Sequence, residues 1–370
     1  MTRILRRRAA GLALAGAMAA AGPGLLAGCH PIPVSGDIRA DAKVVGSIDG
    51  NFEVKLPMAN DPGPVLPVVV RTGTRGDQGP RVALVDVDGL ILNQNQTGLL
   101  SVGENPVSNF REKLEACARD PRVGAVVLRV NSPGGGVAAS DTLAEELRRF
   151  RLVTGKPVVA CLMDVAAGGA YYLAIGADVV IANPNGLVGG IGALFNHANL
   201  KDAMGQLAVT LETVKSGALV DMGSVNGILE ERPAERQLFQ EMVDGYAERF
   251  RARVGAIRRG MTLADRETAF DGRVVVAPKA LALHLVDKLG YLDDALADAE
   301  AMIGQPPCGA EVVMFQRAGL PTHSIYSVTP NSPVQGDLFP FSYPGLDRNK
   351  LPTFLYLWQV DPTLVKTPGK

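Results

Sequence analysis

Short apolar runs rich in β-branched residues recur through the middle of the chain and alternate with longer amphipathic segments. The apolar runs predict β-strands at 81–92, 124–130, 157–163, 178–182 and 207–214. Apolar residues at helical spacing predict helices at 105–120, 139–153 and 231–260, the second of them capped by Ser140 and Asp141. Strands that alternate with helices are typical of βαβ units, which build a mostly parallel sheet. The pattern therefore predicts an α/β fold.

The first thirty residues differ from the rest of the chain. Four arginines within Met1–Arg8 precede an apolar segment of Ala, Gly and Leu that ends at Cys29. A basic segment followed by an apolar one is typical of an export signal. The segment is also about as long as a membrane-spanning helix, but Ala and Gly gain little on transfer to lipid, and Gly22-Pro23-Gly24 would break the helix. A cleaved signal is therefore favoured over a permanent membrane span.

The end of this segment, Leu26-Ala27-Gly28-Cys29, resembles the lipobox of bacterial lipoproteins. The resemblance implies that residues 1–28 are a lipoprotein signal peptide and that Cys29 is lipidated. The protein would then be anchored to a membrane of the cell envelope, facing the periplasm or the exterior. The alternative is an ordinary cleavage site of small residues with an incidental cysteine.

Composition divides the mature chain into three parts. Residues 29–80 are rich in Pro and Gly and read as a tether with a small β segment, including a candidate hairpin at 43–57. Residues 81–302 carry the alternating strands and helices and form the predicted main domain. Residues 303–370 are a C-terminal extension, and the part after about Gly319 is expected to be an extended tail packed on a neighbour or a subunit.

Charge and composition exclude several function classes. With 37 basic and 38 acidic residues the net charge is -1, and no basic stripe with interleaved aromatics is present, so nucleic-acid binding is not expected. A hydrophobic fraction of 47% is too high for a disordered chain. Besides Cys29, three cysteines remain without metal-ligand spacing, and Cys117 and Cys161 are predicted to be buried apolar residues. The four scattered histidines give no metal site, and no cofactor is expected.

Two glycine-rich turns follow predicted strands, at the sheet edge where ligands bind in open α/β folds. The first, Asn131–Gly136, would turn backbone N–H groups toward an oxyanion. The second, at 166–172, would place the start of a helix beneath a groove, but Ala166–Ala170 carry no hydroxyl, thiol or amine. Taken alone, the first turn also fits a tight strand-to-helix connection with no ligand. The residues therefore predict a groove that lacks a nucleophile.

Four consecutive stretches together resemble the signal peptide peptidase A family of membrane-associated serine peptidases, whose fold is that of Clp protease and crotonase. The stretches lie at 126–150, 155–195, 211–224 and 270–296, and the likeness runs in order from about Arg81 to Met302. It implies a superhelix of βαβ units, a location outside the cytoplasm and a ring-like homo-oligomer. It also implies grooves that bind extended peptides as added strands, so the expected partners are peptides or signal-peptide remnants.

Catalysis in this family uses a serine nucleophile deprotonated by a lysine. Carried over by position, the serine that begins the family's Ser-Gly-Gly-Tyr-Tyr run falls on Gly168, and the lysine falls on Val220 in the stretch KSGALVDMGS. The backbone positions of the oxyanion hole fall on Gly135 and Gly169. The resemblance therefore implies a pseudopeptidase that keeps the groove without the catalytic dyad.

Two other functions stay open from the sequence. The first is an active serine peptidase in which Ser132, Ser140 or Ser216 is the nucleophile and Lys215 a substitute base, or in which an active relative supplies the dyad in a mixed ring. The second is crotonase-like acyl-CoA binding, because enzymes of that class also hold a thioester enolate with glycine-rich loops. The consecutive motifs favour the peptidase family over the crotonases.

Overall fold

The computed structural model describes residues 63–74, 76–95, 104–197, 201–210, 212–224, 232–317, 324–325 and 354–358. The predicted signal peptide, the lipidation site Cys29 and the hairpin at 43–57 lie outside these residues. Most of the C-terminal extension past Arg317 also lies outside them.

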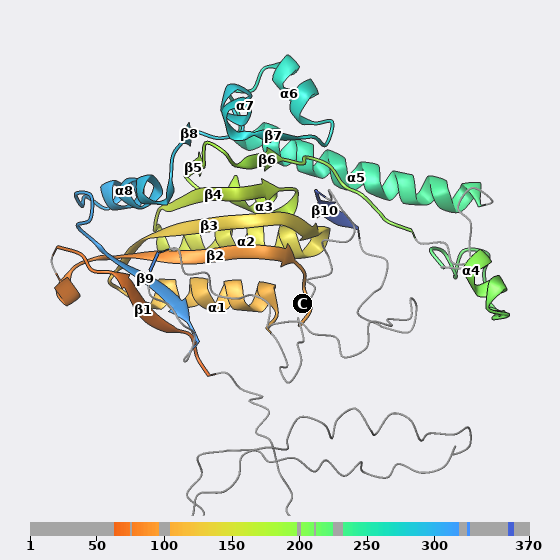
Figure 1. Cartoon of the computed structure of the whole chain (residues 1–370), viewed down its shortest axis with the longest axis horizontal. Coiled ribbons are helices and arrows are strands. Elements are labelled where there is room, and N and C mark those ends of the chain that lie inside the picture. The colour runs from red at the N-terminus through yellow and green to blue at the C-terminus, as the bar shows by residue number, and fades with distance from the viewer. Residues whose placement is uncertain are drawn as a thin grey trace, which may run out of the picture. The chain divides into compact units, whose positions relative to one another are not determined.

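A ten-stranded sheet is the frame of the described part of the chain (Figure 1). Its main order is β1-β9-β2-β3-β4-β5-β8, and all neighbours are parallel except β1, which pairs antiparallel with β9 at one edge. The strands are β1 Leu66–Arg71, β2 Arg81–Ile91, β3 Val123–Gly136, β4 Val158–Ala167, β5 Val179–Ala182, β6 Leu187–Gly189, β7 Val274–Val276, β8 Lys288–Leu289, β9 Glu311–Gln316 and β10 Leu355–Leu357. The short strands β6 and β10 pair with the C-terminal ends of β4 and β3.

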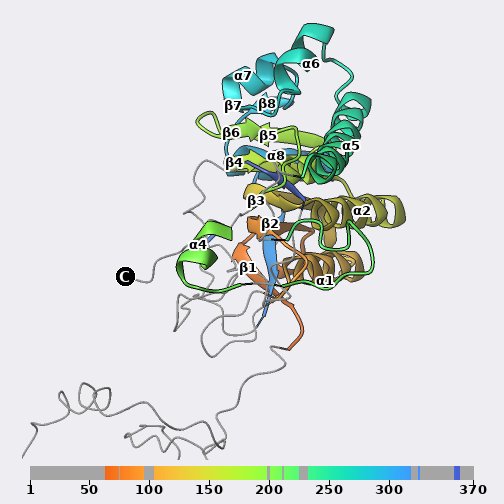
Figure 2. The ribbon, with the colours of Figure 1, turned by 90° about the vertical axis from the view of Figure 1, so that its right-hand side faces the viewer.

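Helices cover both faces of this sheet (Figures 1 and 2). Helices α1, α2 and α3 pack on one face, where they share a continuous apolar core with the strands, and α8 closes a second core on the opposite face. Because side chains alternate along a strand, β2 and β3 supply buried residues to both cores. The helices are α1 Pro106–Arg119, α2 Val137–Thr154, α3 Gly169–Ala174, α4 Lys201–Gln206, α5 Pro233–Ile257, α6 Leu263–Ala269, α7 Ala277–Ala282 and α8 Leu292–Met302, with a 3-10 turn at Gly76–Gln78.

The predicted α/β fold of βαβ units is confirmed. Helices α1 and α2 connect the parallel neighbours β2, β3 and β4, as the alternating pattern implies. Four of the five predicted strands and all three predicted helices are present, with ends shifted by up to six residues. Strands β1, β9 and β10 lie outside the range 81–302, and they extend the sheet with residues from the flanking parts of the chain.

Three local predictions are wrong. No strand forms in the described part of 207–214, where Leu207, Val209 and Val214 are exposed and no neighbouring strand offers a partner. Helix α2 begins at Val137, so Ser140 lies inside it and donates back to the Gly136 carbonyl instead of capping the helix. The predicted turn at 131–136 is the last part of β3, because β2 and β10 both pair with its glycines.

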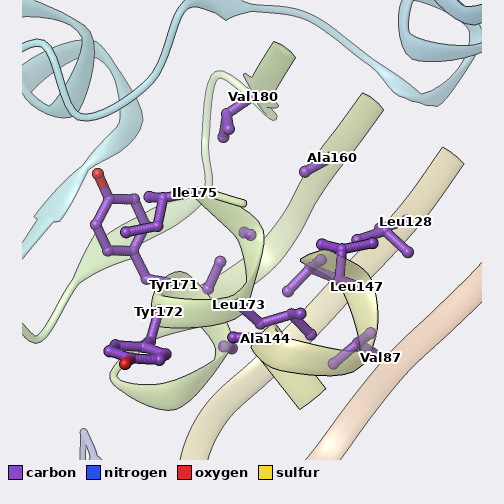
Figure 3. Close-up of a cluster of buried hydrophobic side chains, with 14 of the residues drawn as sticks. Val87, Leu128, Ala144, Leu147, Ala160, Tyr171, Tyr172, Leu173, Ile175 and Val180 are labelled. Atoms are coloured by element: carbon purple, nitrogen blue, oxygen red, sulfur yellow. The ribbon is translucent and has the colours of Figure 1, made fainter. Parts of the chain in front are cut away.

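Helix α3 follows β4 directly and is almost wholly buried (Figure 3). Leu173 lies beside Leu147 of α2, Ile175 lies beside Tyr171, and all four side chains belong to the same apolar core. The ring of Tyr171 is fully buried, and its hydroxyl donates to the Leu285 carbonyl at 2.8 Å, which satisfies its polar end. This packing fixes the start of α3 against the ends of β3 and β4.

A buried ion pair joins the two central strands. Arg129 of β3 donates to Asp86 of β2 at 2.7 Å, and the side chains are only 5% and 1% exposed. Arg129 also donates to the carbonyl of Ile325, which brings a residue from beyond β9 against the sheet. The attraction between the two buried charges offsets part of the cost of removing each from water, and Lys113, which is also buried, is a second cation that acts on Asp86.

Replacing Arg129 by Met should therefore destabilise the fold strongly, because the buried Asp86 carboxylate would lose its hydrogen-bonded ion-pair partner. We expect a loss of about 3–5 kcal/mol in the free energy of unfolding, measured by urea denaturation. The exposed pair Arg148–Glu145, at 2.6 Å, gives the matched control, and Arg148→Met should change stability much less. Equal losses in the two variants would contradict the structural role assigned to the buried pair.

Candidate functional site

The turn between β4 and α3 holds the first predicted site residue. Gly168 is the N-cap of α3 and has φ 53° and ψ −125°, a conformation that strains any residue with a Cβ. Its N–H donates to the carbonyl of Gly189 in β6 at 2.9 Å, and its carbonyl accepts from the N–H of Tyr172 at 2.9 Å. A strained strand-to-helix turn is the geometry that presents a nucleophile in many hydrolases. This protein has such a turn, but the residue on it is a glycine and therefore has no side chain.

The structure brings the predicted oxyanion positions together with Gly168. A Cβ placed on Gly169 would lie 3.5 Å from the backbone nitrogen of Gly135, and one on Gly134 would lie 2.7 Å from the nitrogen of Gly169. The reason is that Gly135 lies at the end of β3 and Gly169 comes just after β4, and the C-terminal ends of these neighbouring parallel strands meet at the same edge of the sheet. The two backbone N–H groups are thus neighbours in one small space.

An extended strand of the same chain runs through this space (Figure 1). Leu355–Leu357, which form β10, pair antiparallel with Gly134–Gly136, and Leu355 also forms a two-way bridge with Leu194 on the other side. The N–H of Leu194 donates to Leu355 at 2.9 Å, and the N–H of Leu355 donates back at 3.0 Å. The cleft beside Gly168 is therefore shaped to hold a polypeptide strand between two backbone edges.

Aromatic side chains line one side of the cleft. The ring of Tyr356 is 1% exposed, lies 4.9 Å from Phe250 and 5.4 Å from Tyr172, and its hydroxyl donates to the Tyr246 carbonyl at 2.7 Å. Burial raises the pKa of Tyr356, so this hydroxyl stays a proton donor. Phe354 packs 5.1 Å from the ring of Tyr246. Helices α3 and α5 thus form an apolar pocket that accepts every second side chain of the strand.

The other predicted dyad position lies on a separate turn. Val220 is 68% exposed, and its N–H donates to Gly217 within the same turn. Lys215, the predicted substitute base, donates to Asp221 at 2.6 Å and to the carbonyl of Ala218 at 3.1 Å. The contacts of the Lys215 ammonium are thus local to its own turn.

The alternative nucleophiles fall into two groups. Ser132 and Ser140 are fully buried: the Ser132 hydroxyl accepts from the N–H of Gly134, and that of Ser140 donates to Gly136. Ser216 is exposed, next to Lys215. Within the described ranges, no lysine or histidine is hydrogen-bonded to either buried serine. The structure therefore brings the glycines of the site together without joining these serines to a base.

The two buried thiols give no nucleophile near neutral pH. Cys117 and Cys161 are buried as predicted, and burial raises the pKa of each to about 12. The part of the chain that the structure describes also contains no group of three or more His, Cys, Asp or Glu side chains able to hold a metal ion.

Sequence reasoning missed the strand β10. The residues 354–358, Phe-Leu-Tyr-Leu-Trp, alternate aromatic and aliphatic side chains, which is a strand signal of period two. The proline-rich surroundings led to the prediction of an extended tail on a neighbour or subunit, whereas these five residues pack on their own chain. The alternation was the available signal.

Comparison with known proteins agrees with the motifs. Residues 151–305 match the model of peptidase family S49. The predicted resemblance to signal peptide peptidases is confirmed. The matched region contains the turn at Gly168, the segment with Lys215 and Val220, and the helices α5 to α8.

Several relatives carry names of this peptidase family. A putative signal peptide peptidase SppA of Enterococcus faecium is 32% identical over 231 residues, which cover 62% of this chain and 65% of that protein. Protease 4 of Salmonella typhi is 31% identical over 61% of this chain and 35% of its own length. The chain thus spans from about a third to just under two thirds of these relatives. A serine protease SPPA of Arabidopsis thaliana chloroplasts is 30% identical over 73% of this chain.

Among solved structures, a variant of a membrane-bound stomatin-specific protease aligns with 65% of this chain and 99% of its own, at 12% identity and a TM-score of 0.39. Helices long and apolar enough to cross a bilayer were sought in the described ranges, and none was found.

The geometry at Gly168 predicts that a side chain there expels the strand β10. In Gly168→Ala the new Cβ would lie 2.2 Å from the carbonyl oxygen of Tyr356, so we expect the amides of Val137 and Leu194, which donate to the strand, to lose protection in hydrogen exchange. Gly155→Ala is the matched control, because Gly155 also has positive φ, 66°, but nothing lies within 4 Å of its added Cβ.

Gly155→Ala should show the backbone strain of a left-handed alanine, about 1–2 kcal/mol. Gly168, at ψ −125°, lies outside the left-handed α region, so the backbone strain of Gly168→Ala should be larger. Only Gly168→Ala should break the pairing of β10 with Gly134–Gly136 and Leu194. If the amides of Val137 and Leu194 were equally protected in the two variants, β10 would not require a glycine at position 168.

Proposed function

We propose that this protein is a peptide-binding pseudopeptidase of the signal peptide peptidase type, which holds extended polypeptides in the cleft beside Gly168 and does not cleave them. The observation that carries the proposal is the pair of empty dyad positions: glycine and valine stand where the resemblance places the nucleophile and the base. The hydrogen of Gly168 cannot attack a carbonyl, and the isopropyl group of Val220 cannot accept a proton.

The remaining parts of the cleft support binding. The ends of β3 and β4 keep closely approaching glycines, and a polypeptide strand is accepted between Gly134–Gly136 and Leu194. Main-chain pairing of this kind gives affinity without sequence information, and the aromatic pocket gives selectivity. Such a cleft needs no acyl chemistry to recognise an extended peptide or a signal-peptide remnant.

The family resemblance also leads us to propose where the protein acts. Lipidation of Cys29 would anchor it to a membrane of the cell envelope, and a homo-oligomer would place several clefts near that surface. The named relatives are proteases, so a mixed assembly with an active relative is the route by which this chain would take part in cleavage.

The absence of acyl chemistry can be tested on the purified full-length protein. It should neither react with a serine-directed fluorophosphonate nor digest fluorescein-labelled casein, since loss of a serine nucleophile or its base lowers turnover by about a millionfold. A Ser–Lys peptidase of the same family, assayed in parallel, should do both. Labelling that disappears in Ser132→Ala, Ser140→Ala or Ser216→Ala would instead establish a relocated nucleophile and refute the pseudopeptidase.

Anchoring can be tested with an alkynyl fatty acid fed to expressing bacterial cells. The full-length protein should take up the label and sediment with membranes, and Cys29→Ala should lose both properties. Cys308→Ala removes an exposed cysteine of the described region and should keep both. Label that persists in Cys29→Ala would rule out this cysteine as the acceptor.

A further inference from the structure

The segment Phe354–Trp358 occupies the cleft as a bound peptide would. Besides the two bonds with Leu194, the N–H of Val137 donates to the carbonyl of Phe354 and the N–H of Trp358 donates to that of Pro133, both at 3.0 Å. Hydrogen-bonded pairs alternate along an antiparallel ladder, so Tyr356 and Gly135 occupy the bonded position between these two rungs. Both edges of the segment are therefore used by the cleft.

Alternate side chains of the segment, Phe354 and Tyr356, point to the same side and enter the aromatic pocket. Tyr356 fills the pocket between Tyr172 and Phe250 and anchors its hydroxyl on Tyr246, while Phe354 stacks into the neighbouring aromatic group. A cavity of about 470 Å³ remains beside these two side chains, lined in part by Asp141 and Arg249. The cleft therefore selects aromatic residues two positions apart and keeps free space next to them.

The position of the Tyr356 carbonyl links this segment to Gly168. A Cβ on Gly168 would lie 2.2 Å from that oxygen and 2.6 Å from the carbonyl carbon, closer than real Cβ atoms approach other atoms. A side chain at position 168 and the segment in this pose therefore exclude each other. The glycine is what lets the chain place its own backbone over the turn.

We propose that Phe354–Trp358 is the resident ligand of the cleft, and that other peptides bind by displacing it. This inference rests on the proposed peptide-binding function and specifies its ligand class: an extended peptide with aromatic side chains two residues apart, of the form aromatic-x-Tyr. A tethered ligand competes at a high effective concentration, so it weakens the apparent affinity for a free peptide without any change in the cleft.

The test uses the full-length protein and one probe, a fluorescein-labelled peptide with the sequence of residues 350–361, KLPTFLYLWQVD. Two variants release the resident segment. Tyr356→Asp puts a charge in the aromatic pocket, and Leu355→Pro removes the N–H that donates to Leu194. Tyr356→Phe is the matched control, because it keeps the ring and loses only the hydroxyl.

Fluorescence anisotropy should show tighter binding of the probe to Tyr356→Asp and Leu355→Pro than to the wild type, by about tenfold or more. Tyr356→Phe should stay near the wild type, and a probe with Asp at the tyrosine position should bind none of the proteins. In Leu355→Pro the amides of Val137 and Leu194 should exchange faster and regain protection when the probe is added. The amide of Gly168, bonded to Gly189, should stay protected and report that the fold is intact.

The possible failures are distinct. If the probe bound equally tightly to all variants and to the wild type, the proposal that Phe354–Trp358 competes for the cleft would be wrong. The proposed peptide-binding function would still hold. No binding to any folded variant would overturn both proposals. Loss of Val137 protection on dilution of the wild type would show that the segment comes from a second copy, which would overturn occupancy by the same chain.

Discussion

Three backbone segments meet at the site more closely than side chains allow. A Cβ on Gly134 would lie 2.0 Å from the Tyr356 oxygen, and one on Gly168 would lie 2.2 Å from the same atom. Glycine is costly in ordered structure, since it loses the most conformational freedom on folding. Its presence at both positions keeps open a space that the backbone of β10 fills. The end of β3, the start of α3 and the strand between them all depend on this missing volume.

The lack of a side chain at Gly168 also determines what can lie on the turn between β4 and α3. Any residue with a side chain at position 168 would project it into the space that β10 fills. The backbone of β10 lies directly on the turn, so β10 and a side chain at position 168 would compete for the same space. Gly168 thus sets the shape of the site, and a serine at this position would displace β10 as well as add a hydroxyl.

The sequence predicts those parts of the molecule whose signals are local. Buried β-branched runs identify β2 to β5, and the glycines of the site meet because Gly135 lies at the end of β3 and Gly169 just after its parallel neighbour β4. The run at 207–214 has the same composition but no partner strand, and propensity alone does not supply one. Residues 354–358 show the converse: a short alternating pattern becomes a strand because distant glycines pair with it. The turn that carries Lys215 has no periodicity from which its position could be predicted.

The order of strands in the sheet has a consequence for how the protein is made. Strand β9 lies between β1 and β2, and Arg81 at the start of β2 reaches Glu311 of β9 at 2.7 Å. Because a chain emerges N-terminus first, from the ribosome or through a membrane, β2 appears more than two hundred residues before its outer neighbour, and its edge stays unpaired until β9 follows. Completion of the nascent sheet is postponed until almost the whole polypeptide has been synthesised, a delay that favours chaperone binding along that edge.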